Sequence, residues 1–374
     1  MTSKKEVFSV PAPERLSQRP DSENIIVHYD RVDEVLGTLM EAYENEHYPY
    51  YMDRVRVPQD ERHMPPSLER GTKEHAMFLW NVCYYMRGGT KSTFAVQQMA
   101  EVYEDRPELF DCYEIIATPQ DDIEKELSAH KLGFQKTVAK QWIENAWRLL
   151  ENYDGDPRNI FTDLPEHEQP YEELVSRIKN DNKGGGFIGF REKMTSMIAY
   201  YLMDEDLVEP FNFPIPIDLH VMRVSVSSGM VSFPDVEFPA NVHSETLLKT
   251  LRDVYSDYAE RHGVNPLRLC NAVWLLSESL CGQAPGNQVL EPNGRDNRVG
   301  RLTTLLPEEV NPEDPAQQKR YERTCGRCPI ESTCDLNVHG GAMYYAAGRL
   351  AVRGTRLRFP TNTLFGEAFL RENT

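Results

Sequence analysis

The sequence lacks two features that would place the protein in a membrane or outside the cell. Its 374 residues contain no run of about 18 apolar residues, so a membrane-spanning helix is not expected. The start, MTSKKEVFSVPAPERLSQRPDSEN, has no apolar core of the kind that a secretory signal needs. We therefore expect a cytoplasmic protein with no membrane partner. In that compartment, its seven cysteines indicate metal binding or free thiols rather than a disulfide framework.

An excess of basic residues, the usual mark of nucleic-acid binding, is also missing. The formal net charge is −18 at pH 7, which counts against a DNA-binding protein. The charge is uneven, however. Residues 101–128 hold ten acidic residues against two basic ones, whereas residues 343–360 hold four arginines and no acid. A local basic face on an acidic protein is therefore compatible with the sequence.

Convincing strand alternation is scarce, and the sequence shows no internal repeat or low-complexity segment. Apolar residues make up 40% of the chain and aromatic residues 10%, which indicates a globular protein. Apolar side chains recur at helical spacing in several segments, which we expect to be helices: residues 32–43, 75–86, 92–104, 133–155, 171–178, 244–262 and 266–281. The predicted fold class is all-α.

The stretch 184–224, GGGFIGFREKMTSMIAYYLMDEDLVEPFNFPIPIDLHVMRV, has the features of a site. Gly186 and Gly189 allow a tight hairpin next to the positive end of the following helix, an arrangement that suits a phosphate. An extended, Pro-rich run then places Asp218 at the start of a second helix, where negative charge is favoured. The simpler interpretation, an ordinary helix–loop–helix with Asp218 as an N-cap, stays open.

A second strong signal is the segment CGRCPIESTC, which contains Cys325, Cys328 and Cys334. Three thiols packed into a polar loop indicate a metal centre, which needs a fourth ligand. Cys281, at the end of the preceding helix, is the candidate, whereas Cys270 lies near the start of that helix. Zinc is the competing metal, although zinc sites more often show two short cysteine pairs. Reduced core cysteines without a metal are the remaining alternative.

These motifs together resemble the helix–hairpin–helix (HhH-GPD) DNA glycosylases of the endonuclease III superfamily that carry a C-terminal [4Fe-4S] loop. LGFQKTVAKQWIENAWRLLENY is similar to the family's helix LG-x-x-x-x-KA…I…A…LL, GFREKMTSM to its hairpin PGFGRKTA, and PIDLHVMRV to its segment VDTHVxRV. The cysteine triplet matches the spacing of the last three cluster ligands, and SESLCG resembles the helix end that supplies the first. The resemblance covers residues 75–336.

The chain departs from the family pattern in three places. Arg191 stands where the hairpin's second glycine usually lies, which puts the phosphate contact there in doubt. Residues 282–324 separate the first cluster cysteine from the second as an inserted loop, where the family has a short spacer. The first 70 or so residues match no part of the family core.

The resemblance implies two catalytic residues. Cleavage of an N-glycosidic bond builds positive charge on the sugar, and Asp218 is by position the carboxylate that stabilises it. Lys193 falls at the family's nucleophile position, where its amine would form a Schiff base and permit strand cleavage. Two alternatives to that role stay open: Lys193 as a lysine that contacts phosphate, and an alignment shifted by one residue, which puts Met194 there and makes the enzyme monofunctional.

The resemblance also implies the DNA contacts and the metal ligands. The expected DNA-binding residues are Gly186, Gly189, Arg191, His220, Arg223 and Arg87. For His220 and Arg223, two roles other than DNA binding stay open: orientation of the Asp218 helix and plain helix packing. Tyr84, Tyr85 and Met86 lie next to Arg87 at a helix end where relatives fill the gap left by a flipped base, although aromatic residues there could equally be core. The expected ligands of a [4Fe-4S] cluster are Cys281, Cys325, Cys328 and Cys334.

We therefore predict a two-lobed, all-α DNA glycosylase that acts as a monomer on double-stranded DNA and is nucleoid-associated when bound. It would excise a damaged or modified base, with or without an associated lyase activity. The alternative is a non-catalytic iron–sulfur protein that binds DNA or senses damage. The expected parts are an N-terminal arm and partly helical extension (1–73), a six-helix barrel-like lobe ending in the hairpin motif (74–204), the lobe with the Asp218 helix and the cluster (205–340) and a basic C-terminal tail (341–374).

Overall fold

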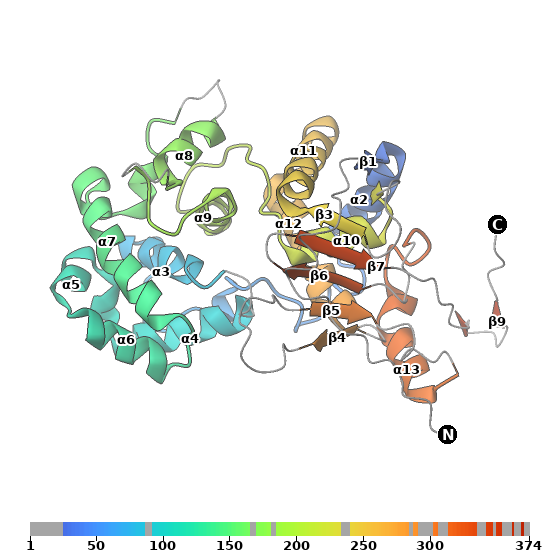
Figure 1. Cartoon of the computed structure of the whole chain (residues 1–374), viewed down its shortest axis with the longest axis horizontal. Coiled ribbons are helices and arrows are strands. Elements are labelled where there is room, and N and C mark those ends of the chain that lie inside the picture. Colours follow the sequence, from blue (N-terminus) through green and yellow to red (C-terminus); the bar gives the residue numbers. More distant parts are fainter. Residues whose placement is uncertain are drawn as a thin grey trace. The chain divides into compact units, whose positions relative to one another are not determined.

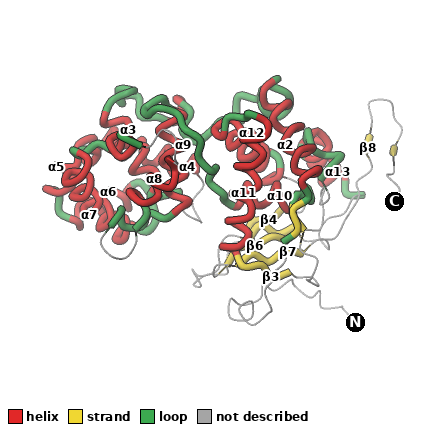
Figure 2. The backbone as a smooth tube through the Cα atoms, turned by 90° about the horizontal axis from the view of Figure 1, so that it is seen from above, coloured by secondary structure: helices red, strands yellow, loops and turns green. Residues whose placement is uncertain are grey.

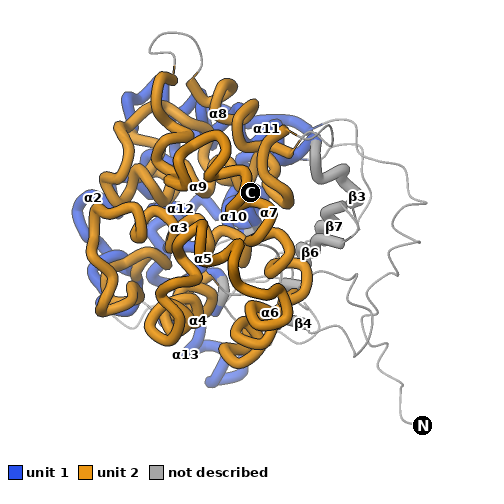
Figure 3. Tube along the Cα trace, turned by 90° about the vertical axis from the view of Figure 1, so that its left-hand side faces the viewer, with its two compact units in different colours: residues 1–55, 217–264, 271–374 blue, residues 56–216, 265–270 orange. Residues whose placement is uncertain are grey.

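The structure is a computed structural model, and it divides the chain into two compact units (Figure 3). Unit 1 combines Met1–Val55, Ile217–Val264 and Asn271–Thr374, whereas unit 2 combines Arg56–Pro216 and Asn265–Cys270. The residues that it describes are 25–86, 92–164, 170–180, 185–232, 240–283, 287–290, 302–305, 313–334, 342–346, 349–353, 361–362 and 368–369. Among these, no helix is both long and apolar enough to cross a membrane.

Unit 2 is built from helices around a buried central helix (Figures 1 and 2). Its helices are α3 (Lys73–Cys83), α4 (Ser92–Asp105), α5 (Cys112–Ala117), α6 (Gln120–Ala129), α7 (Gln135–Tyr153), α8 (Pro170–Ile178) and α9 (Glu192–Asp204). Every residue of α3 from His75 to Cys83 is buried, as expected for a helix that is apolar nearly all round. Short 3₁₀ turns lie at Glu61–His63, Pro107–Phe110 and Pro157–Phe161.

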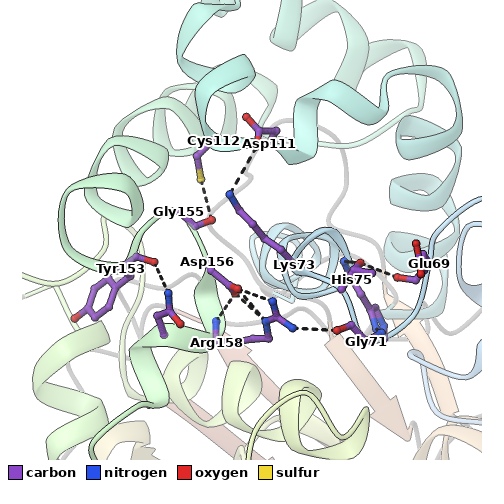
Figure 4. A network of polar contacts seen from close by, with 12 residues as sticks. Glu69, Gly71, Lys73, His75, Asp111, Cys112, Tyr153, Gly155, Asp156 and Arg158 are labelled. Carbon is purple, nitrogen blue, oxygen red and sulfur yellow. Dashed lines mark hydrogen bonds and ion pairs between the residues drawn. The ribbon is translucent and has the colours of Figure 1, made fainter.

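The start of α3 is fixed by a network of polar contacts (Figure 4). The Thr72 hydroxyl caps the helix by accepting a hydrogen bond from the His75 amide at 3.2 Å. Arg158 pairs with Asp156 at 2.7 Å and also donates to the Gly71 carbonyl at 2.9 Å. The loop after α7 is therefore tied to the residues that begin the central helix.

Unit 1 contains the remaining helices and all the strands that the structure describes (Figure 2). Its helices are α2 (Tyr29–Glu44), α10 (Leu219–Ser227), α11 (Ser244–His262), α13 (Pro315–Arg323) and most of α12 (Pro266–Ser279). Helix α2 buries one apolar face, formed by Val32, Val35, Leu36, Leu39 and Met40. Helices α2, α11 and α12 lie where the apolar periodicity predicted them, and α10 follows Asp218 as expected. Helix α13 was not predicted, because it lies within the expected insertion 282–324.

A five-stranded antiparallel sheet is the part of unit 1 that the sequence did not predict. Its strands, in spatial order, are β3 (Ala240–His243), β7 (Arg349–Arg353), β6 (Ala342–Ala346), β5 (Leu302–Leu305) and β4 (Asn287–Leu290). Two small pairs, β1 (Ile26–Val27) with β2 (Val231–Ser232) and β8 (Thr361–Asn362) with β9 (Ala368–Phe369), complete the strands described.

The fold is thus mostly helical, as predicted, but not purely so. The expected insertion 282–324 contributes β4 and β5, and the expected basic tail 341–374 contributes β6 and β7. Strands of four or five residues give too short an alternating pattern to be recognised, and their partners lie far away in the chain.

Candidate active site

A helix–hairpin–helix motif is present in unit 2, formed by α8, the described residues 179–180 and 185–191 between the helices, and α9. The Phe187 amide donates to the Ile178 carbonyl at 2.9 Å, and the Asn180 amide donates to the Phe190 carbonyl at 3.1 Å. Gly186 has a φ of 62°, and a Cβ at this position would lie 2.2 Å from the Lys179 carbonyl oxygen. Only glycine allows the two sides of this hairpin to approach so closely.

Aromatic side chains anchor the hairpin to the core of unit 2. Phe187 and Phe190 are buried, and both pack against Trp80 of α3, with ring centroids 4.7 and 4.5 Å apart. Tyr84 meets Phe190 edge to face at 5.4 Å. The hairpin backbone is therefore held by the same central helix that the network in Figure 4 fixes at its other end.

Helix α7 holds the tip of the hairpin through hydrogen bonds. The Asn145 side chain accepts from the Ile188 amide at 2.8 Å and donates to the Ile188 carbonyl at 3.0 Å. Arg148 donates to the Gly186 carbonyl, and Gly189, at a φ of 86°, completes the turn. Because both the amide and the carbonyl of Ile188 are hydrogen-bonded to Asn145, the conformation of the turn is fixed.

Lys193 lies in the first turn of α9, directly after the hairpin. Its side chain is half-buried, and Nζ donates to the Met86 carbonyl at 3.1 Å. Burial raises the pKa of the nearby Cys83 thiol, and the charge of Lys193 opposes that rise. Met194, the residue that a shifted alignment would place at the nucleophile position, is 5% exposed and belongs to the core.

The residues around Met86 resolve one of the open alternatives. Tyr84, Tyr85 and Met86 are all buried, and the Tyr84 hydroxyl accepts a hydrogen bond from Asn145 at 2.7 Å. They are core residues in this state of the protein, so they do not present side chains that could fill a gap in the duplex. Arg87 lies outside the described residues.

Asp218 is the N-cap of α10 in unit 1. Its Oδ1 accepts hydrogen bonds from the amides of His220 and Val221, at 2.8 and 3.1 Å. Its second oxygen, Oδ2, makes no hydrogen bond to any residue that the structure describes. The two interpretations of Asp218 are therefore compatible, because the cap occupies one carboxylate oxygen and leaves the other for a substrate.

His220 and Arg223 turn towards α12 and meet at one serine. His220 Nδ1 lies 3.2 Å from Ser277 Oγ, and Arg223 Nη1 donates to the same oxygen at 3.1 Å. The His220 ring also packs on Trp274, with centroids 5.3 Å apart. Burial lowers the pKa of the Arg223 guanidinium, and the nearby Cys281 and Asp218 oppose this shift. These contacts favour an orienting role for both side chains, and their DNA contact remains a prediction.

The structure brings together the four cysteines that the sequence analysis selected. Cys281 lies in a 3₁₀ turn after α12, Cys325 begins another at Cys325–Arg327, and Cys328 and Cys334 follow. Burial raises the pKa of the Cys328 thiol, and the other three sulfurs raise it further because they lie close by.

Cys270 belongs to unit 2, where it neighbours Tyr200. The cysteine site is tied to the end of the Asp218 helix, because the Cys334 thiol donates to the Ser227 carbonyl at 3.4 Å.

The spacing of these sulfurs can be compared with what a single metal ion requires. Tetrahedral zinc holds its thiolates ~3.8 Å from one another, given a Zn–S bond of about 2.3 Å. In the described part of the chain, no three cysteine sulfurs all lie within 4.8 Å of one another. The described cysteine sulfurs are therefore not arranged at the mutual spacing that a single zinc ion requires.

N-terminal residues cover the cysteine segment, which the sequence did not reveal. The Arg31 guanidinium donates to the Thr333 carbonyl at 3.2 Å, and the Tyr48 hydroxyl donates to the Arg323 carbonyl. Tyr50 donates to the Ala272 carbonyl at 2.8 Å, and its pKa is raised by burial and by the nearby cysteines. The only sequence signal for this role was the Tyr-rich run HYPYY.

Residues 149–291 match the AGOG family, described as N-glycosylase/DNA lyase. The matched stretch holds the hairpin, Lys193, Asp218 and Cys281, and it is less than half of the chain. The resemblance to DNA glycosylases inferred from the motifs is thereby confirmed. The match ends before the other three cysteines.

The solved structures that resemble the chain include the following three, each with a TM-score below 0.5. They are a trapped endonuclease III–DNA covalent intermediate (TM-score 0.44, 11% identity, 72% of this chain and 92% of that chain), the Methanocaldococcus jannaschii 8-oxoguanine glycosylase/lyase with DNA containing 8-oxoguanine (0.42, 12%, 66% and 98%) and a thermostable thymine-DNA glycosylase (0.40, 13%, 67% and 88%). No curated protein matches the chain.

Proposed function

We propose that the protein is a DNA glycosylase that excises a damaged or modified base from duplex DNA and then cleaves the strand as a lyase. One observation carries the proposal. The segment that matches an N-glycosylase/DNA lyase family contains both the closed hairpin with Lys193 and a carboxylate, Asp218, with one uncommitted oxygen among the described residues. Each feature occurs alone in many proteins, but their combination in one matched segment favours this chemistry.

DNA binding is assigned to the hairpin and to the start of α9. Backbone N–H groups at a helix N-terminus attract anions, and the Arg191 side chain makes no capping bond that would compete with a phosphate. Gly186 and Gly189 keep the turn free of side chains, so a phosphate can approach the backbone. This local attraction for phosphate allows DNA binding despite the net negative charge of the whole chain.

Base excision is assigned to Asp218. As the bond between the base and C1′ breaks, its electron pair leaves with the base and positive charge develops on the sugar. A fixed carboxylate oxygen stabilises this charge, and the two amide bonds to Oδ1 hold the group in place for that purpose.

Strand cleavage is assigned to Lys193. Its neutral amine would attack C1′ and replace the base, the ring would open to a Schiff base, and loss of a proton from C2′ would expel the 3′ phosphate. The Met86 carbonyl holds the amine in one position at the start of α9.

Cys281, Cys325, Cys328 and Cys334 would hold a [4Fe-4S] cluster, which supplies cross-linking and redox capacity rather than a step in base release. The protein residues around the site have their own tasks. Tyr50 and Arg31 brace the segments that carry the ligands.

The experiment is an abasic-site assay. Protein purified anaerobically with its metal is incubated with a panel of duplexes that carry single damaged or modified bases. We expect abasic sites and then strand breaks on at least one duplex. Salt-sensitive binding to these duplexes without any base release would instead identify a non-catalytic DNA-binding or damage-sensing protein.

A further inference from the structure

A cluster of ionisable side chains lies in unit 2, where α4 and α6 end. Asp105 is the last residue of α4, Glu126 lies in the last turn of α6, and His130 follows α6 as its C-cap. Among the described residues, these three are the group of histidine, cysteine, aspartate or glutamate side chains whose ligand atoms all lie within 4.8 Å of one another. The proposed base excision and strand cleavage use none of them.

The imidazole of His130 lies between the two carboxylates. Its Nε2 is 3.1 Å from Asp105 Oδ2 and 3.1 Å from Glu126 Oε1. The contact with Glu126 has hydrogen-bond geometry, whereas Asp105 lies at an ion-pair distance. A ring nitrogen carries at most one proton. That proton serves one carboxylate well, whereas a metal ion between the three atoms serves both.

The other nitrogen of the ring has a partner of its own. Nδ1 of His130 lies 3.3 Å from the Oε2 of Glu101, which is one turn before Asp105 on α4. A carboxylate that accepts from Nδ1–H keeps the proton on that nitrogen and leaves the Nε2 lone pair for a metal. The His130 side chain is only 11% exposed, so the ring is held in this orientation by its protein neighbours.

Spacing and charge both suit a divalent transition-metal ion. Ligand atoms on a tetrahedral zinc ion, with bonds of about 2.0–2.2 Å, lie ~3.3–3.6 Å apart. The two contacts of 3.1 Å at Nε2 are close to that separation. Two helices end at the cluster, and the carbonyl end of a helix favours positive charge. Arg106 pairs with Glu108 and approaches Glu126 through its other oxygen, Oε2, at 3.9 Å.

We propose that Asp105, Glu126 and His130 bind a divalent transition-metal ion of the zinc class, with Glu101 as the residue that orients the His130 ring. Nε2 and one oxygen of each carboxylate are the protein ligands, and water completes the coordination shell. The bound ion joins the ends of α4 and α6 and thereby stabilises unit 2. This metal site is separate from the proposed base excision and does not depend on it.

The first test counts the metal bound by the folded protein. Wild type and variants, purified with the metal of the cysteine site in place, are dialysed against Zn²⁺ buffered at a low micromolar concentration, and bound zinc is measured by mass spectrometry. We expect Asp105→Asn and His130→Gln each to bind one zinc ion fewer per chain than the wild type. Metal at the cysteines is common to all the proteins and cancels in this difference.

His262→Gln is the matched control. The Nε2 of His262 also meets a carboxylate oxygen, Asp33 Oδ1 at 3.2 Å, but Arg261 already pairs with that carboxylate at 2.8 Å. This variant should bind as much zinc as the wild type. Equal zinc in the wild type and all three variants would overturn the proposal and identify the cluster as an ion-paired imidazolium. An equal loss in His262→Gln and His130→Gln would also overturn it.

The second test observes the His130 ring in the wild type, so it does not depend on the folding of a variant. With ¹⁵N-labelled histidine, added Zn²⁺ should shift the Nε2 signal of His130 and leave Nδ1 protonated. An unchanged ring, or metal on Nδ1, would contradict the ligand assignment.

Zn²⁺ should also raise the unfolding temperature of the wild type, and this shift should be lost in Asp105→Asn. The Asp105 side chain is 66% exposed, so the amide is not expected to disturb folding. An equal shift in both proteins would count against the site. None of these measurements involves DNA, so their failure leaves the proposed function standing, and a protein that releases no base can still bind this metal.

Discussion

Two helix N-termini in this protein are built in opposite ways. Helix α9 of unit 2 begins at Arg191, whose side chain makes no capping hydrogen bond, and it follows a hairpin made narrow by Gly186. Helix α10 of unit 1 begins at Asp218, whose carboxylate accepts from two of the first amides. The N-terminus of α9 is suited to bind an anion from another molecule, whereas the N-terminus of α10 already holds the carboxylate of Asp218.

The contrast shows how the same local electrostatics can serve binding and catalysis. At α9, where the Arg191 side chain makes no cap, the positive end is the proposed phosphate site. At α10 the positive end is used to hold a carboxylate in one orientation, which leaves Oδ2 fixed but uncommitted among the described residues. Binding and charge stabilisation are thus assigned to different units, and substitutions should separate them.

The largest expected effect belongs to the α10 side of the comparison. Asp218→Asn keeps the size and the capping ability of the side chain but removes the negative charge. Base release under single-turnover conditions should fall by roughly 10²–10³-fold, because stabilisation of the developing sugar cation is lost. Duplex affinity, measured by fluorescence anisotropy, should be retained.

Asp111→Asn is the matched control, because Asp111 caps α5 with the same pair of amide bonds. It should leave base release unchanged. Full base release by Asp218→Asn would contradict the role assigned to the Asp218 charge. An equal loss of base release in both variants would show that Asp218 acts only as a helix cap.

The cysteine site, which lies in the same unit as α10, gives the next prediction. Cys281→Ser should lose the bound iron, or be recovered only in an unfolded form, since one of four ligands is gone. Cys270→Ser should keep the iron, because Cys270 lies in unit 2. Iron and acid-labile sulfide are measured on anaerobically purified protein. Zinc in place of iron in the wild type, or the reverse behaviour of the two variants, would contradict the ligand assignment.

A smaller effect is expected from Gly186→Ala on the α9 side. An alanine there would meet the Lys179 carbonyl at 2.2 Å, so the hairpin must open. Gly263→Ala is the control, since Gly263 has the same φ of 62° but no atom within 4 Å of an added Cβ. Both should lose about 1–2 kcal/mol of unfolding free energy from the left-handed backbone.

Only Gly186→Ala should lose more stability than that, and only it should bind duplex DNA more weakly. Urea unfolding and binding at a fixed salt concentration measure the two effects. Equal stability losses, with unchanged DNA affinity in both, would show that the hairpin does not contact the duplex.

The sequence predicted the parts of the fold that depend on local patterns. Helices such as α7 and α11 have one continuous apolar face, and the glycine-rich turn was recognised because few residues tolerate positive φ. The cysteine triplet was recognisable because a polar loop rarely buries three thiols. In each case the signal lies within about 20 residues.

What the sequence did not predict depends on contacts between distant segments. The five-stranded sheet pairs β3 with β7 across more than a hundred residues, and each strand is short. Tyr50 of the N-terminal part bonds to Ala272 on α12, and Ser277 meets His220 and Arg223 from another helix. The aromatic run that ends at Met86 had two interpretations, and only burial separated them.

The most direct test of the account is to locate the covalent bond between the protein and DNA. Borohydride reduces a Schiff base, so the trapped complex can be digested and the modified lysine identified by tandem mass spectrometry. We expect the adduct on Lys193. It should be absent in Lys193→Gln and retained in Lys179→Gln, a hairpin lysine that pairs with Glu192 at 2.9 Å. An adduct on another lysine, or base release by the wild type without any trapping, would contradict the role assigned to Lys193.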